Sequence, residues 1–96
     1  MPALDPVIHA PARLRIMAAL TALLPRSQID FRTLSRTLDL TDGNLGAHLQ
    51  TLEEAGYIKI EKSFIDKKPR THLATTAKGR ARFEEHVAAL RDICKL

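Results

Sequence analysis

The sequence predicts a mostly α-helical fold with one small β-hairpin, in which a helix-turn-helix unit is followed at once by a basic hairpin. Three observations carry this prediction. Two short amphipathic segments, 30–38 and 41–55, lie only a few residues apart. An alternating stretch that is rich in cations, 57–75, follows them directly. Apolar residues then recur at helical spacing over 76–96. We expect the order helix, short strand, helix, helix, strand, turn, strand, helix, in a single domain over residues 1–96.

Residues 1–10 are expected to form a leader, and the first helix is predicted over 11–24. Pro11 can begin this helix, because proline is tolerated in the first turn, and Pro25 ends it. The helix carries two roughly opposite apolar stripes. The stripes consist of Leu14, Met17, Thr21 and Leu24, and of Ile16, Leu20 and Leu23. A small domain cannot easily bury both faces, which favours contact of one face with a second subunit. The alternative is a central core helix.

The second helix is predicted over 30–38, with Asp30 as its N-cap. Its inner stripe consists of Phe31, Leu34 and Leu38. A turn at residues 39–40 leads into the third helix, and two short helices joined in this way form a helix-turn-helix, whose second helix reads DNA. Residues 27–29 are expected to add a short strand beside the hairpin.

The third helix, 41–55, has the pattern of a recognition helix. Thr41 suits the N-cap, and Gly56 suits the left-handed position that ends a helix. One stripe is apolar and consists of Leu45, Leu49 and Leu52. The other face is small and polar and consists of Gly43, Asn44, Ala47, Gln50 and Thr51. Asn and Gln can pair with an adenine edge in the major groove. The alternative is an ordinary solvated face.

Gly46 lies inside this predicted helix. A glycine there costs about 1 kcal/mol relative to alanine. The residue therefore indicates either tight packing on a neighbouring helix or close approach of a partner.

The segment 57–75 is predicted to form a hairpin. Its first strand alternates, with Ile58, Ile60 and Phe64 on one half-buried face. A turn is expected over 66–70 and a second strand over 71–75. Residues 59–82 contain eight Lys or Arg against two acidic residues, a net charge of +6 in a chain of +4. This concentration of positive charge is typical of phosphate binding.

The last helix is predicted over 76–96, with Thr76 as its N-cap. Phe83, Val87, Leu90 and Cys94 recur with the spacing of a two-stranded coiled-coil seam. We expect this stripe and the first helix to form a homodimer interface; packing within the chain is the alternative. The expected interface residues are Ile16, Leu20, Leu23, Phe83, Val87, Leu90 and Cys94.

Composition excludes several classes of protein. Aromatic residues make up only 4% of the chain, whereas single-stranded nucleic-acid modules depend on aromatic stacking. No apolar run approaches the roughly 20 residues that span a bilayer. The four histidines are scattered, the single cysteine has no partner and no glycine-rich phosphate loop is present. We therefore expect a cytoplasmic protein without enzymatic activity, metal or cofactor.

Three stretches resemble winged-helix transcriptional regulators of the ArsR and MarR type. The run from Asn44 to Ile58, which contains a His-Leu pair, a further leucine and Ala-Gly before the strand, resembles their recognition helix. The opening from Leu4 to Met17 resembles their first helix. The run Thr76-Ala77-Lys78-Gly79-Arg80 resembles the start of the helix after the wing.

The resemblance implies a dimeric regulator that binds double-stranded operator DNA through the third helix and the wing. Base-facing positions would be Asp42, Gly43, Asn44, Ala47 and Gln50. Backbone contacts would come from Thr41, Thr51, Lys67, Lys68 and Arg70. The recognition helix departs from the usual pattern, because it has no Lys or Arg over 42–52 to contact guanine. Cysteine pairs are absent, so metal sensing is not implied.

Two questions stay open at this point. One alternative is a winged helix that contacts another protein and not DNA. The other concerns a small-molecule effector, whose identity is unknown and which would have room only between the first and last helices.

Overall fold

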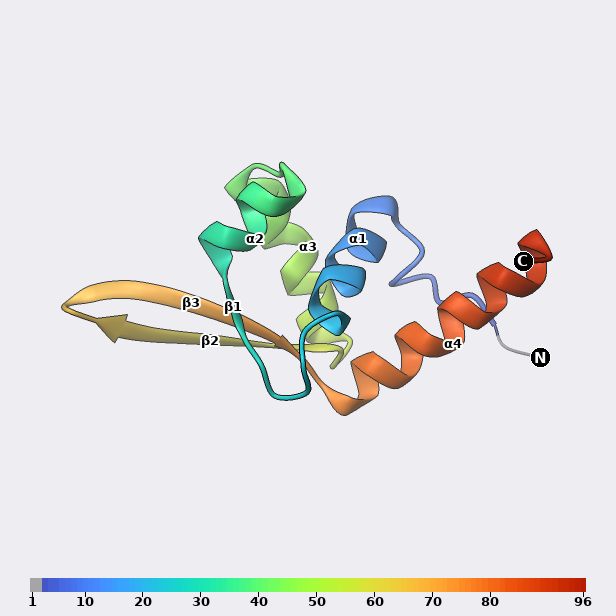
Figure 1. Ribbon diagram of the computed structural model, residues 1–96. Helices are drawn as coiled ribbons and strands as arrows, with labels where there is room; N and C mark the ends of the chain where they lie inside the picture. The colour runs from blue at the N-terminus through green and yellow to red at the C-terminus, as the bar shows by residue number, and fades with distance from the viewer. Residues whose placement is uncertain (1–2) are drawn as a thin grey trace.

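The computed structural model describes residues 3–96, so the first two residues of the expected leader lie outside it. Within this range the order of elements is the expected one (Figure 1). The elements are α1 (Pro11–Thr21), β1 (Ile29–Asp30), α2 (Phe31–Leu38), α3 (Asp42–Glu54), β2 (Ile58–Ile65), β3 (Lys68–Thr75) and α4 (Ala77–Cys94). No helix in the described range combines the length and apolarity needed to cross a membrane.

The three strands form one antiparallel sheet in the order β1-β3-β2. In the long hairpin, Ile58 pairs with Thr75 and Ile65 with Lys68. Asp66 and Lys67 alone form the turn, and both have positive φ angles, 52° and 63°. Two left-handed residues give the turn type whose twist matches that of the strands. The expected turn over 66–70 is therefore wrong, since Lys68 to Arg70 already belong to β3.

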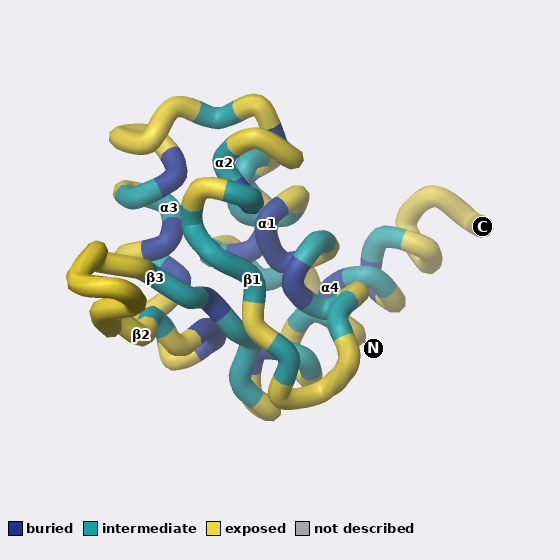
Figure 2. The backbone as a smooth tube through the Cα atoms, turned by 60° about the vertical axis from the view of Figure 1, so that its left-hand side comes forward, coloured by how far each residue is buried: buried dark blue, intermediate teal, exposed yellow. Residues whose placement is uncertain are grey.

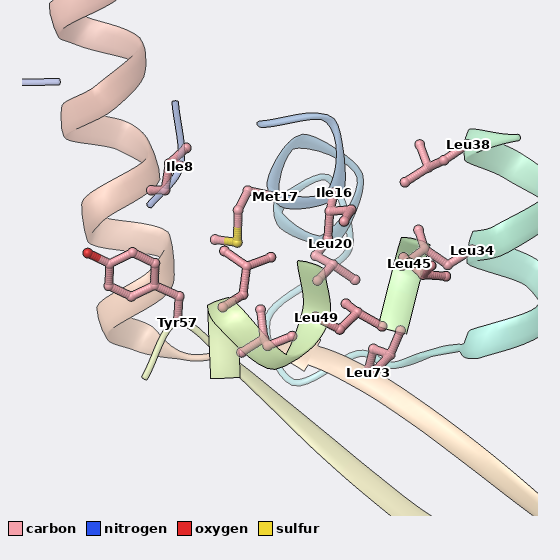
Figure 3. Packing of buried hydrophobic residues seen from close by; sticks show 12 residues of the cluster. Ile8, Ile16, Met17, Leu20, Leu34, Leu38, Leu45, Leu49, Tyr57 and Leu73 are labelled. Carbon is pink, nitrogen blue, oxygen red and sulfur yellow. The ribbon is translucent and has the colours of Figure 1, made fainter. Parts of the chain in front are cut away.

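Helix α1 lies at the centre of the molecule and contacts α3, α4 and β3. Ile16, Met17 and Leu20 on this helix are at most 1% exposed, and they pack with leucines of α2 and α3 and with Leu73 of β3 (Figure 3). The alternative of a central core helix is the observed arrangement. The expected interface is corrected accordingly, because Ile16 and Leu20 have no exposed surface to offer a second subunit.

The helix starts agree with the sequence prediction. The side chains of Asp30, Thr41 and Thr76 accept hydrogen bonds from backbone N–H groups in the first turns of α2, α3 and α4. Each bond satisfies a donor that the helix itself leaves free.

Helix α1 ends at Thr21, three residues before the predicted end. Pro25 disfavours the helical conformation of the residue before it. The guanidinium of Arg80 holds the new end, because its Nη1 donates to the Thr21 carbonyl at 2.9 Å and its Nη2 to the Leu23 carbonyl at 2.7 Å. The Arg80 side chain of α4 thus satisfies carbonyl groups in the stretch that was predicted to be the last turn of this helix.

Candidate nucleic-acid interface

Helix α3 buries one stripe and exposes the other, as the sequence predicts. Leu45, Leu49 and Leu52 are at most 2% exposed. Gly56 ends the segment with a φ of 81°, a conformation that favours glycine. The residues predicted to face bases all lie on the exposed side. These are Asp42, Gly43, Asn44, Ala47 and Gln50.

Several polar side chains of α3 already have partners within the chain. Asp42 accepts from the Ser35 hydroxyl at 3.3 Å, and Gln50 donates to Glu54 at 3.2 Å. The hydroxyl of Thr51 donates to the Ala47 carbonyl at 3.3 Å. The Gln50 amide therefore has to leave Glu54 before it can pair with a base, whereas Asn44 has a side chain with no such bond within residues 3–96.

The two glycines of α3 face open space. A Cβ added at Gly43 or Gly46 would meet no atom within 4 Å other than those of its chain neighbours and of the adjacent helix backbone. Tight packing on a neighbouring helix therefore does not explain Gly46. The other explanation, close approach of a partner, stays a prediction.

The hairpin projects from the body as a wing, and every residue from Glu61 to Arg70 is exposed (Figures 1 and 2). Side chains alternate between its two faces. The inner face, which continues the core face of the sheet, bears Ile58, Ile60, Lys62 and Phe64. The predicted alternation is observed, but the predicted half-burial of Phe64 is wrong. This residue is 77% exposed, because the core ends at Ile60.

The predicted phosphate-binding cations of the wing do not share one face. Lys67 lies in the turn, and Lys68 and Arg70 lie on the outer face, on the side opposite Phe64. Arg70 lines a shallow hollow of about 540 Å³ together with Arg32 and Arg36 of α2. Sequence reasoning missed these two arginines, although their spacing of four on a helix could have shown that they share a face.

Some of the cations that give residues 59–82 their positive charge form structural contacts within the chain. Lys78 donates to the carbonyl of Ala55 at 3.0 Å, at the C-terminal end of α3. Arg80 binds the end of α1 in the same way, and Arg82 forms an ion pair with Glu85 at 3.3 Å. Cations at helix C-termini are favourable because carbonyl groups are free there. Of the cations over 59–82, those of the wing are therefore left for a partner, and the exposed Arg32 and Arg36 of α2 lie beside them.

A groove of about 690 Å³ separates α3 from the wing. Gly46, Gln50 and Glu53 line it on the helix side, and Lys62 and Thr71 line it on the inner face of the wing. Helix α3 itself contains three acidic residues and no Lys or Arg. Any attraction for a polyanion at this site would therefore have to come from the elements that flank α3.

A cluster of polar side chains lies where the leader meets α4, and it consists of Asp5, His9, Tyr57 and His86. His86 is 0% exposed, and its Nδ1 accepts from the backbone N–H of Asp5 at 2.9 Å. Neutral His86 therefore carries its proton on Nε2, which lies 3.4 Å from Nδ1 of His9. The Tyr57 hydroxyl donates to the Asp5 carboxylate. Burial lowers the pKa of His86 below its ordinary 6.5, and the nearby His9 lowers it further.

This cluster is a structural contact, because it holds Asp5 of the leader against Tyr57 and against His86 of α4. Burial and the Asp5 carboxylate raise the pKa of Tyr57 to about 12, so the hydroxyl stays protonated as a donor. No group of three metal-ligating side chains is assembled within residues 3–96.

The remaining residues of the expected dimer interface differ in exposure. Leu23 and Phe83 pack against the core of their own chain. Val87 and Leu90 are half-buried, and Cys94 is exposed near the end of α4. Exposed apolar side chains accompany them at the end of this helix, where Ile93 is 62% and Leu96 is 93% exposed.

Comparisons with known proteins agree with this geometry. The family model of the winged helix DNA-binding domain matches residues 12–94. The uncharacterized protein MJ0432 of Methanocaldococcus jannaschii is 34% identical over 89 residues, which cover 93% of this chain and 94% of the relative. Both matches span the helices and the wing, so they extend over the whole of the interface described above.

Solved structures show the same architecture. A transcriptional regulator homologue from Pyrococcus horikoshii has a TM-score of 0.84 and 31% identity, covering 93% of this chain and 85% of the other. A MarR-family regulator from Silicibacter pomeroyi has a TM-score of 0.65 and 19% identity, covering 91% and 58%. The second similarity concerns the fold alone. The expected winged-helix architecture is thereby confirmed.

Proposed function

Because the chain belongs to the winged helix DNA-binding domain family, we propose that it is a transcriptional regulator that binds double-stranded DNA at specific sequences. Helix α3 enters the major groove in this account. The observation that carries the proposal is the exposed, small and polar face of α3 beside a projecting cationic wing. The related protein from Pyrococcus horikoshii is described as a transcriptional regulator homologue, which supports the same function here.

Sequence would be read mainly by Asn44 and Gln50, whose amides can donate to and accept from one adenine edge. Gly43, Gly46 and Ala47 would let the helix backbone approach the bases. Asp42 would accept from a cytosine amino group, since a carboxylate near phosphates is otherwise repelled. The operator sequence follows from these preferences only in part, because wing and shape readout contribute as well.

Phosphate contacts would come from Thr41 and Thr51 at the edges of α3 and from Lys67, Lys68 and Arg70 of the wing. Arg32 and Arg36 extend this cationic surface onto α2. In helix-turn-helix proteins the first helix of the unit crosses the DNA backbone, which is the position of α2 in this chain. Binding should therefore depend steeply on salt.

We further propose that the functional unit is a homodimer joined through the C-terminal part of α4. Val87, Leu90 and Cys94 lie along one stripe of this helix, and the exposed Ile93 and Leu96 extend it. A second copy would cover these apolar side chains. Two copies would also present two recognition helices, which suits an operator with two half-sites.

A protein-contact module is the second candidate function. It is favoured by one observation, the three acidic residues and absent cations of α3. A partner protein with a basic surface would fit such a helix. The cationic wing and the arginines of α2 argue for DNA instead, and the two candidates differ in their dependence on salt.

Selection of binding sites from random duplex DNA tests the proposal. Asn44→Ala and Gln50→Ala should each weaken binding to the selected site by roughly 1–3 kcal/mol while hardly changing affinity for random DNA. Ala88→Ser, an exposed substitution on α4, is the matched control and should leave both affinities unchanged. Equal losses on both kinds of DNA would mean that these amides do not read bases. Failure to enrich any site, with flat salt dependence, would favour the protein-contact function.

A further inference from the structure

The tip of the wing exposes a large aromatic side chain among cations. Phe64 is 77% exposed and lies opposite Pro69 on the neighbouring strand. Such a cross-strand pair stabilises a hairpin by roughly 0.2–1 kcal/mol. The pair nevertheless leaves most of the phenylalanine in water, so the packing of the hairpin does not account for the side chain.

The surroundings of Phe64 indicate the chemistry of its partner. Residues 62–70 contain four Lys or Arg and a single acidic residue, Asp66. Lys62 shares the face of Phe64, Lys67 lies in the turn, and Lys68 and Arg70 lie on the opposite face. An apolar side chain flanked by cations in this way fits a polyanion that also has apolar surface. Duplex DNA has both, because stacked bases lie between two rows of phosphates.

The direction and reach of the wing favour DNA beside the recognition helix. Phe64 lies on the inner face, in line with Ile60 and Lys62, and this face is the one that borders the groove next to α3. The five exposed positions of β2, residues 61–65, advance about 3.3 Å each, so they extend the hairpin roughly 17 Å beyond the core. The groove of about 690 Å³ lies between α3 and the base of this face, so the wing and α3 stand apart from one another.

Resting on the DNA-binding function proposed above, we propose that the wing tip enters the minor groove beside the recognition helix and that Phe64 inserts there as an apolar wedge at one base step. Proteins that insert apolar side chains in this way partly unstack the step and kink the duplex. The cations around the tip would contact the flanking phosphates. Pyrimidine–purine steps unstack most easily, so the selected operators should carry such a step at the wedge position.

The experiment uses the full chain and duplexes that the parent protein has selected. 2-Aminopurine replaces one base at successive positions beside the step, and its fluorescence rises when it is unstacked. Phe64→Ala tests the wedge, and Phe64→Thr tests it with a residue that favours strands. Ile65→Ala is the matched control, because Ile65 is 48% exposed at the same tip but on the outer face. Circular dichroism checks that each variant is folded.

The parent should raise the fluorescence at one step. Both Phe64 variants should abolish the rise and weaken binding roughly tenfold or more, the change expected when an aromatic side chain is no longer buried. Ile65→Ala should change neither. The proposal is overturned if the parent binds the duplex and the Phe64 variants keep its fluorescence signal, whatever their affinity. Failure of the parent to bind any duplex would contradict the proposed function itself. Binding of the parent to phosphatidylglycerol vesicles in place of duplexes, lost in Phe64→Ala, would assign the tip to a membrane surface and overturn the wedge.

Discussion

At the scale of the single residue, Gly46 separates stability from function most clearly. Its surroundings are open, so an alanine methyl group would meet no neighbour. Gly46→Ala should therefore raise the free energy of unfolding by up to about 1 kcal/mol, the intrinsic preference of a helix for alanine. The same variant should weaken DNA binding, because the backbone can no longer approach its partner as closely. Chemical denaturation and titration with the selected duplex measure the two effects.

Gly79 provides the control for this prediction. A Cβ there would lie 2.0 Å from the carbonyl oxygen of Tyr57, so Gly79→Ala should destabilise the fold. Gly46→Ala contradicts the account if it destabilises the protein as well, or if it stabilises the protein and leaves DNA affinity unchanged.

His86 makes stability depend on pH. Its folded-state pKa lies below the ordinary 6.5, so the unfolded chain binds more protons than the folded chain in that window. The contribution of neutral His86 to the free energy of unfolding should be fully present above about pH 6.5. It should be lost as the pH falls through the folded-state pKa of His86. Asp5, His9, Tyr57 and Arg82 are the ionisable groups that surround this site. Protonation would also place a hydrogen on Nδ1, where the imidazole now accepts from the backbone.

His86→Asn removes the titration and keeps an acceptor for the Asp5 N–H group. Its free energy of unfolding should fall less than that of the parent between pH 7 and pH 5, measured by urea denaturation at each pH. His72→Asn, on the hairpin, serves as the control and should keep the dependence of the parent. An unchanged slope in His86→Asn would show that another group causes the acid loss.

At the scale of the element, cationic side chains of one helix donate hydrogen bonds to free carbonyl groups at the C-terminal end of another. Arg15 donates to the Leu38 carbonyl at 2.8 Å at the end of α2, and Lys78 and Arg80 do the same for α3 and α1. Arg80→Met keeps the length of the side chain but leaves two carbonyl groups without their donor. We expect a loss of about 2 kcal/mol in thermal or urea unfolding, since hydrogen bonds to charged groups contribute about 1.5–3 kcal/mol each and water replaces part of the loss.

Arg82→Met is the matched variant for Arg80. Its ion pair with Glu85 is solvent-exposed, and such pairs contribute about 0–1 kcal/mol. Similar losses in the two variants would show that the contact of Arg80 with the end of α1 has no special importance for stability.

The elements also show where sequence reasoning succeeds. The N-caps at Asp30, Thr41 and Thr76 depend on a side chain and the backbone three residues later, so local pattern is sufficient. The end of α1 depends on Arg80, which lies 59 positions away from Thr21 in the sequence. No local pattern contains that contact, and the predicted helix was consequently too long.

In the candidate interface, too, local features could be predicted from the sequence and features of the tertiary structure could not. The exposed face of α3 follows from its periodicity. The two-residue wing turn could not be predicted in the same way. Asp66 tolerates a left-handed conformation, but the next position has Lys67 where such turns usually have glycine. The exposure of Phe64 depends on where the core ends, and the burial of Ile16 and Leu20 depends on four elements meeting around α1. Both are properties of the tertiary structure.

At the scale of the whole molecule, the protein is elongated, with principal extents of 50 × 25 × 21 Å. The wing and the C-terminal end of α4 lie at opposite ends (Figure 1). In the proposed function, one end would bind DNA while the other joins a second copy. Light scattering should therefore give about twice the monomer mass of 10.7 kDa.

A single charge in the α4 stripe tests that assignment. Leu90→Lys should return the protein to monomer, because an ammonium group would be buried without a partner between the two copies. Ala88→Lys, on the exposed side of α4, should leave the dimer intact. A parent protein that stays at 10.7 kDa at micromolar concentration would contradict the homodimer but not the DNA-binding surface.

The most direct test of DNA binding through α3 and the wing is the salt dependence of affinity in two double variants. Lys67→Gly with Lys68→Ala removes two cations at the wing tip. Arg26→Gly with Arg82→Ala removes two exposed cations outside the wing, α2 and the end of α4. Each variant places glycine at a left-handed position, so the backbone is equally accommodated. The wing variant should flatten the slope of log affinity against log salt by about 1.8 per subunit, at about 0.9 per phosphate contact. The control variant should keep the parental slope. Equal slopes in all three proteins would contradict the central claim that the wing binds DNA.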